Sequence, residues 1–200
     1  WPVTCKQVQF YNGGNAGVQE GQATTTGYML FKRFNRSISK TSPGVASQNR
    51  PSIIFRLADF YLIYAEVANE VNPSDSRVLT YLNLVRERAG LPKVEILNPG
   101  IVGNKELQRA AIQRERQIEL ATEGQRYFDV RRWMIADKDG EGRQNGYAHG
   151  MNVRGTINDT EEFNRVVETE KIVFNRKMYL QPIPDHEMRK TQNLVQNPGW

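Results

Sequence analysis

Cysteine is nearly absent from this sequence of 200 residues, and histidine is almost as rare. The single cysteine, Cys5, cannot form a disulfide within the chain, and neither a CxxC nor an HExxH spacing occurs. The two histidines, His149 and His186, stand far apart without a neighbouring ligand, which favours lone surface side chains. A chain of this length can bury a core without a disulfide or a metal, so the sequence predicts no cofactor and no metal site.

Long apolar runs are also absent. No stretch approaches the roughly 20 apolar residues that a membrane-spanning helix needs. Residues 1–5 contain neither an initiator Met nor the apolar core of a signal peptide. We therefore expect a chain that spans no bilayer, and a start that resembles a processed or shortened product whose targeting signal would lie upstream.

Acidic residues are scarce in the first quarter of the chain. Residues 1–56 contain seven Lys and Arg against the single acid Glu20, whereas residues 57–200 contain twenty against twenty-one acids. Aromatic residues between cations, as in FKRFNRSISK at 31–40, can stack on nucleic-acid bases. A strand with a solvated basic face explains the same pattern, and we favour it. No nucleic-acid partner is expected.

From residue 51 onward, apolar residues recur at the spacing of amphipathic helices. Pro51–Ser52 predicts the start of the first helix, and Asn104 is predicted to cap the third. The three apolar faces are Ala58, Tyr61/Leu62, Ala65 and Ala68; Val78, Leu82, Val85 and Ala89; and Leu107, Ala111, Ile118 and Ala121. A helix is expected to resume at 127–133, followed by loop to about residue 160, a strand at 166–174 and a short helix at 185–190.

The stretch ERQIELATEGQRYFDVRRW, residues 115–133, carries charges of both signs. Three glutamates recur every fourth residue, with neighbouring Cβ atoms about 5–6 Å apart. That distance suits a retaining glycosidase pair, but side chains on adjacent turns of one helix point the same way and cannot flank a sugar. Arginines at contact spacing favour the ionised carboxylates and predict a self-neutralising structural brace tied to neighbouring helices. The predicted brace comprises Glu115, Glu119, Glu123, Arg126, Asp129 and Arg132, with Tyr127, Phe128 and Trp133 buried.

Four blocks occur in the order FRLADFYLIYAEVANE, YLNLVRERAGLP, AIQRERQIELATEGQRYFDVRRW and YLQPIPDHEMRKTQNLVQNPGW. This order resembles the C-terminal half of SusD/RagB-type proteins of the Bacteroidetes, and GYMLFKRF at 27–34 resembles the strand before the first block. The resemblance covers about residues 27–200. It implies a mainly α, SusD-like fold with TPR-like helix pairs, long loops and a few short strands. Residues 1–50 would form a loop- and strand-rich segment, compact with a C-terminal-like helical domain at 51–200.

The resemblance also implies a function without catalysis. SusD-like proteins are lipid-anchored at the external face of the outer membrane, capture glycans and pass them to a SusC-like TonB-dependent transporter. We therefore expect an oligosaccharide or polysaccharide ligand and a SusC-like partner. Membrane attachment would come only from a lipid anchor missing from this chain, because Cys5 has no apolar region before it. A peptide-binding RagB-like member and a protein-binding helical scaffold are the alternatives.

No enzyme is expected, and ligand contacts are sought among loop aromatics instead. Asp185, His186 and Glu187 form no triad, because no Ser or Cys partner is indicated. Apolar faces of sugars stack on aromatic rings, while side-chain amides bind their hydroxyls. The candidates are Trp1, Tyr11 and Asn12 in the Gly-rich opening, and Asn145 and Tyr147 in the Gly-rich segment after residue 133. Ordinary loop packing is the alternative for each.

Overall fold

The computed structural model describes residues 11–14, 24, 26–28, 30, 32, 53–138, 146–155 and 166–200. Its contacts divide the chain into two compact units, one of residues 50–134 and one that joins residues 1–49 to residues 135–200. The sequence instead predicted a division at residue 50, which would place residues 135–200 in the same domain as the helices. Of the predicted features, Trp1, Cys5, Asn145 and most of the basic stretch 31–40 lie outside the described residues.

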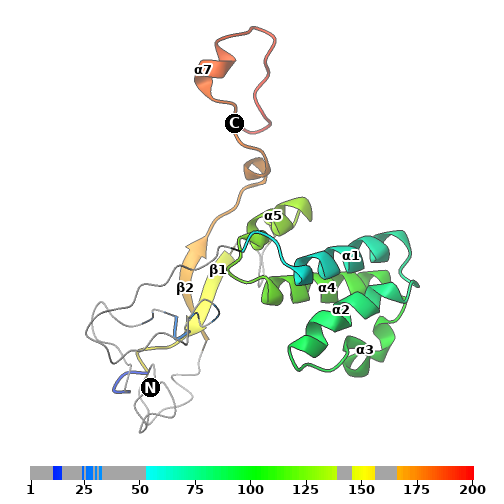
Figure 1. Cartoon of the computed structure of the whole chain (residues 1–200). Helices are drawn as coiled ribbons and strands as arrows, with labels where there is room; N and C mark the ends of the chain where they lie inside the picture. Colours follow the sequence, from blue (N-terminus) through cyan, green and yellow to red (C-terminus); the bar gives the residue numbers. More distant parts are fainter. Residues whose placement is uncertain are drawn as a thin grey trace, which may run out of the picture. The chain divides into compact units, whose positions relative to one another are not determined.

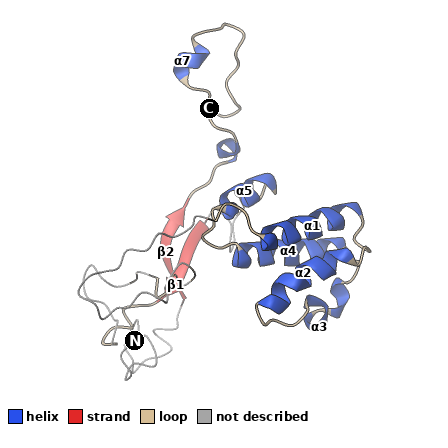
Figure 2. Ribbon diagram, in the orientation of Figure 1, coloured by secondary structure: helices blue, strands red, loops and turns tan. Residues whose placement is uncertain are grey.

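The unit of residues 50–134 is helical (Figures 1 and 2). Its elements are α1 (Leu57–Val71), α2 (Arg77–Arg88), α3 (Val94–Leu97), the 3-10 helix η1 (Pro99–Ile101), α4 (Lys105–Glu119) and α5 (Gln125–Arg132). Helix α1 packs against both α2 and α4. The core between them consists of Ala58, Leu62, Ala65, Val78, Leu82, Val85 and Ile112. The predicted stripes, which ran from residue 58 to 68 and from 78 to 89, are therefore buried or partly buried except at Ala89, which is exposed, and the alanines of the first stripe allow close approach of the helices.

The first helix begins later than predicted. Residues 51 and 52 lie outside the described part of the chain, and α1 starts at Leu57, after Arg56 in an extended conformation. The guanidinium of Arg56 binds Glu119 and Glu123. This long-range contact holds the chain before α1 against the end of α4, so the predicted start at Pro51–Ser52 is wrong.

Helix α4 presents a different face to the core from the one predicted. Its buried residues are Gln108, Ile112, Glu115 and Arg116, whereas Ile118 is 59% exposed. The face is turned by one position, or about 100°. The apolar pattern predicted the wrong face because the buried face contains charged side chains, which form ion pairs with residues of other helices. The predicted cap is confirmed, since Asn104 Oδ1 accepts a hydrogen bond from the Leu107 amide at 3.2 Å.

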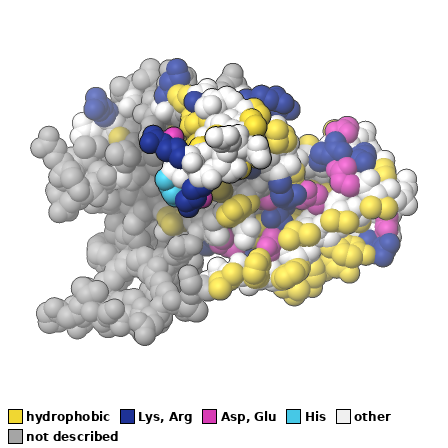
Figure 3. Space-filling view, turned by 90° about the horizontal axis from the view of Figure 1, so that it is seen from above, with side chains coloured by type: hydrophobic (Ala, Val, Ile, Leu, Met, Phe, Trp, Pro, Cys, Tyr) yellow, Lys and Arg dark blue, Asp and Glu magenta, His cyan; other side chains and the backbone are white. Residues whose placement is uncertain are grey.

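Helix α1 is apolar on both of its sides. Opposite its buried stripe, the exposed side carries Phe60, Ile63, Tyr64, Val67 and Val71. Figure 3 shows hydrophobic side chains gathered in a band over the helical part of the molecule, on the right of the view. A helix with two apolar faces is typical of a position with neighbours on both sides.

The other unit contains a two-stranded antiparallel sheet of β1 (Gly146–Met151) and β2 (Val166–Ile172). Gly146 pairs with Ile172 and Met151 with Val166, with an irregularity between Ala148 and His149. The predicted strand at 166–174 is confirmed by β2. The predicted loop up to residue 160 is wrong over β1. Its glycines suggest turns, but pairing with the β-branched strand β2 stabilises an extended conformation.

The C-terminal residues of this unit are tied down by local contacts. After the 3-10 helix η2 (Arg176–Tyr179) comes α7 (Asp185–Met188), which confirms the predicted short helix. The indole Nε1 of Trp200 donates to the carbonyls of Lys177 and Leu180, each at 3.0 Å. The Lys177 ammonium lies 4.3 Å from the centre of the Trp200 ring. These contacts give Trp200 a structural role.

Candidate functional site

The three glutamates of the predicted brace bind arginines from outside the brace. Glu115 pairs with Arg86 of α2 at 2.8 Å, and Glu123 pairs with Arg56 at 2.7 Å. Glu119 binds both Arg56 and Arg88. These contacts connect α4 and the turn after it to α2 and to the segment before α1. These pairs run between helices and so extend beyond the single stretch in which the spacing predicted a ladder.

A guanidinium lies at the centre of this arrangement. Arg116 of α4 donates to Asp59 of α1 at 2.8 Å and to Asp129 of α5 at 2.9 and 3.2 Å. The side chain of Arg116 is only 2% exposed, and both carboxylates are buried as well. Sequence reasoning missed Arg116 and Asp59. Their positions in the sequence could have indicated burial, because Asp59 follows Ala58 on the inner side of α1 and Arg116 lies one turn after Ile112.

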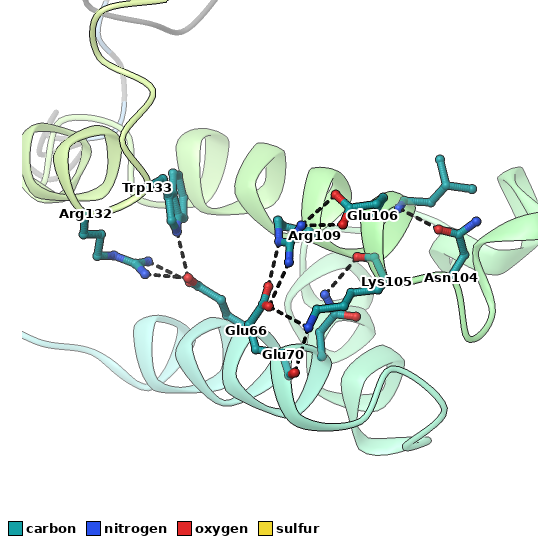
Figure 4. Close-up of polar contacts among 10 residues, drawn as sticks. Glu66, Glu70, Asn104, Lys105, Glu106, Arg109, Arg132 and Trp133 are labelled. Carbon is teal, nitrogen blue, oxygen red and sulfur yellow. Dashed lines mark hydrogen bonds and ion pairs between the residues drawn. The ribbon is translucent and has the colours of Figure 1, made fainter. Parts of the chain in front are cut away.

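Helix α5 continues the charged contacts toward the surface. Arg132 binds Asp129, a predicted pair three residues apart, and it also binds Glu66 of α1. Trp133 Nε1 donates to the same Glu66 carboxylate at 2.7 Å (Figure 4). The remaining brace residue, Arg126, has its guanidinium 5.9 Å from the centre of the Trp133 ring.

A second charged cluster lies farther along α1 and α4. Glu70 accepts hydrogen bonds from Arg109 at 2.7 and 2.8 Å, and Lys105 lies 3.0 Å away (Figure 4). Arg109 also binds Glu106. The hydrogen bond from Arg109, with the Lys105 charge, lowers the pKa of Glu70 from its ordinary 4.5 to about 2. The lowered pKa keeps Glu70 ionised and so opposes its use as a proton donor.

The predicted burial of two aromatic residues in the brace is wrong. Phe128 is 64% exposed, and Tyr127 is also exposed. They contact each other edge to face, and the Arg131 guanidinium stacks over the Tyr127 ring. Because α5 has only eight residues, it has room for one buried face, which Asp129 and Val130 occupy.

The predicted ligand residues that the structure describes fall at two ends of the strand β1. The Asn12 amide donates to the Gly155 carbonyl at 2.9 Å, which places Tyr11 and Asn12 beside the turn that follows β1. Tyr147 lies at the other end, in the strand and opposite Lys171, so its prediction as a loop residue is wrong. With about 3.3 Å per residue, the four steps from 147 to 151 span about 13 Å. The structure therefore does not bring Tyr147 together with Tyr11.

A third segment meets the same end of β1. The Met151 amide donates to the Thr26 carbonyl at 2.9 Å. Gly27 has a φ of +73°, and a Cβ on it would lie 2.7 Å from the Met151 Cβ, so only glycine fits this close approach. Tyr28 follows and is 59% exposed. Sequence reasoning did not select Tyr28, because its approach to residues 151–155 depends on long-range pairing.

Two features are absent from the residues that the structure describes. No helix among them combines the length and the apolar character needed to cross a membrane. Nor do these residues bring together three side chains that could jointly hold a metal ion.

The sequence pattern of the SusD family matches residues 3–200. The chain belongs to the SusD family. SusD-like protein P25 of Formosa agariphila is 44% identical over 106 residues, which cover 53% of this chain and 19% of the relative. A SusD-like protein of Bacteroides ovatus is 36% identical over 120 residues, which cover 54% of this chain and 20% of the relative.

Solved structures confirm the predicted fold class. The crystal structure of a SusD-like protein from Bacteroides fragilis matches this SusD-family chain with a TM-score of 0.59 and 31% identity. The match covers 74% of this chain and 26% of that protein. The predicted mainly α, SusD-like fold is therefore confirmed. The chain spans only about a fifth to a quarter of the length of the relatives that it matches.

Proposed function

We propose that this SusD-family chain belongs to a non-catalytic nutrient-capture protein of the outer membrane, which binds glycans and passes them to a SusC-like TonB-dependent transporter. The observation that carries the proposal is the family match over residues 3–200. The ion-paired carboxylates of the helical unit support a role for those residues in stability and not in chemistry.

The ligand surface is proposed to lie on the other unit, around strand β1. Tyr11 and Asn12 lie beside the turn after β1, and Tyr147 lies in the strand itself. A tyrosine followed by an asparagine, as in Tyr11 and Asn12, supplies the apolar surface and the hydrogen-bonding groups that sugar recognition requires. The helical unit is proposed to serve as scaffold.

Isothermal titration calorimetry against panels of oligosaccharides and peptides tests this function. We expect saturable binding to an oligosaccharide, weakened by Tyr11→Ala or by Tyr147→Ala. Phe128→Ala is the control, because Phe128 is an exposed aromatic residue of the helical unit. Chromatography of the glycan after incubation should show no shortened product.

Other outcomes would favour the competing functions. Binding of peptides alone would favour a RagB-like peptide-binding protein, and release of shortened glycan would contradict a non-catalytic role. If no ligand binds while circular dichroism shows a folded chain, the proposed ligand surface on this chain is wrong.

A further inference from the structure

Three segments that are distant in sequence meet at the end of strand β1. Residues 11–14 contact the turn through the bond from the Asn12 amide to Gly155, and residues 24–28 contact it through the bond from Met151 to Thr26. Thr24 Oγ1 donates to the Tyr28 carbonyl at 2.9 Å, which fixes the backbone that carries the exposed Tyr28 ring. We call the place where these segments meet the β1 end site, and define it by Tyr11, Asn12, Tyr28, Asn152 and Arg154.

Arg154 is the charged member of the β1 end site. The Asn152 side chain accepts a hydrogen bond from the Arg154 amide at 3.3 Å and so fixes the turn. The Arg154 side chain is exposed, and its guanidinium makes no ion pair with any residue that the structure describes. Several arginines of the helical unit differ, because the guanidiniums of Arg56, Arg86 and Arg116 are bound to carboxylates.

The described residues of the β1 end site include Arg154 and no acid, whereas residues 156–165, which lie outside the described part of the chain, contain Asp159, Glu161 and Glu162. Residues 11–14, 24–32 and 146–155 contain no Asp or Glu, and residues 1–49 contain five Lys and Arg against the single acid Glu20. Strand β2 carries Glu168 and Glu170, but these pair with His149 and Ala148 in the middle of β1. At the Met151 end the opposing residue is Val166.

Together these groups have a specific chemical preference. A guanidinium binds a carboxylate or sulfate through two parallel hydrogen bonds, and such charge-assisted bonds are stronger than neutral ones. The tyrosine rings offer apolar surface for a sugar face. The side-chain amides of Asn12 and Asn152 offer hydrogen bonds to hydroxyls. We infer that the β1 end site binds an acidic oligosaccharide, one that carries carboxylate or sulfate groups. This inference rests on the proposed glycan-binding function and specifies its ligand.

Calorimetry with matched glycan pairs tests the inference on the 200-residue chain. The probes are a hexagalacturonate with its fully methyl-esterified form, and a sulfated carrageenan hexasaccharide with its desulfated form. We expect at least one acidic probe to bind roughly tenfold or more tightly than its neutral counterpart, as a charge-assisted bond implies. The difference should shrink as NaCl is raised, because salt screens exposed charges.

Substitutions assign the effect to the site. Arg154→Gln should remove most of the preference for the acidic probe, while Arg154→Lys should retain part of it. Arg114→Gln is the matched control, since Arg114 is an exposed arginine of α4 with no ion pair to the described residues, and it should change nothing. Tyr28→Ala should weaken acidic and neutral probes alike.

Each contrary outcome is distinct. If acidic and neutral glycans bind equally, or if Arg154→Gln leaves the preference intact, the inference is wrong while the proposed glycan-binding function stands. If a hexanucleotide binds as well as the acidic sugars, the site is a general anion surface and the inference is again wrong. Binding of acidic peptides alone, or of no probe, contradicts both proposals.

Discussion

The cost of burying the Arg116 guanidinium is offset only when its pairing is complete. Removing an ion from water costs several kcal/mol, and this cost is offset only where hydrogen bonds satisfy the buried groups. Arg116 uses Nε and both Nη atoms to bind Asp59 and Asp129. The arrangement therefore stabilises the fold only while all three side chains are present, since loss of the cation leaves two buried carboxylates facing each other.

Arg116→Met should destabilise the helical unit by about 3–5 kcal/mol, the usual cost of breaking a buried pair by removing one partner. Urea denaturation followed by circular dichroism measures the change. Arg114→Met, two positions earlier on the same helix and exposed, is the control and should stay within about 0.5 kcal/mol of the original chain. A small effect of Arg116→Met would show that the buried charges contribute no net stability.

Glu70 gives a prediction about pH. Its pKa is lowered to about 2 by the hydrogen bond from Arg109, so the pair stabilises the folded state above pH 4.5 and loses this contribution as the pH falls toward 2. Carbon-detected NMR of the side-chain carboxyl should show this titration directly. Arg109→Gln should move the pKa of Glu70 back up, whereas the control Arg114→Gln should leave it in place. A midpoint near 4.5 in the original chain would contradict the pairing.

At the scale of elements, apolar periodicity predicted the faces of α1 and α2 correctly and that of α4 incorrectly. The inner positions of the first two helices are mostly Ala, Leu and Val, so composition and burial agree. In α4 the inner face includes Glu115 and Arg116, whose partners lie on other helices. Local sequence holds no information about those partners, and the same limitation concealed β1, which becomes a strand through its pairing with β2.

The cap of α4 is an element whose prediction succeeded and can be tested further. Asn104→Ala should cost about 1 kcal/mol, because the Leu107 amide loses its side-chain acceptor. Asn104→Ser should retain most of the stability, since serine also caps helix N-termini. Urea denaturation of both variants measures the difference. Equal losses in the two variants would show that the side chain matters for something other than capping.

At the scale of the whole molecule, the candidate site was predictable by composition but not by position. Tyr11 and Asn12 were selected because Gly-rich segments with aromatics and amides suit sugar binding. Arg154 and Tyr28 are brought near them by the backbone bonds of Gly155 and Met151. Such bonds between distant segments leave no trace in the spacing of residues.

The division into two units predicts independent folding of the helical one. The contacts of Arg116, and the core around Leu62 and Leu82, lie within residues 50–134. A fragment of these residues should therefore be helical by circular dichroism and unfold cooperatively in urea. It should also bind a hydrophobic dye, because the outer side of α1 is exposed. Gradual unfolding without a transition would contradict the prediction.

The ion pairs that join α1 to α4 and α5 also bear on synthesis of the chain. Asp59 and Arg116 are 57 residues apart, and Glu66 and Arg132 are 66 apart. A growing chain releases α1 from the ribosome well before it releases α5, so the carboxylates of α1 emerge before their cations. The hairpin of α1 and α2 must then wait in water with Asp59 uncompensated. Closure of the helical unit during translation is thus set by the emergence of residues 116–132.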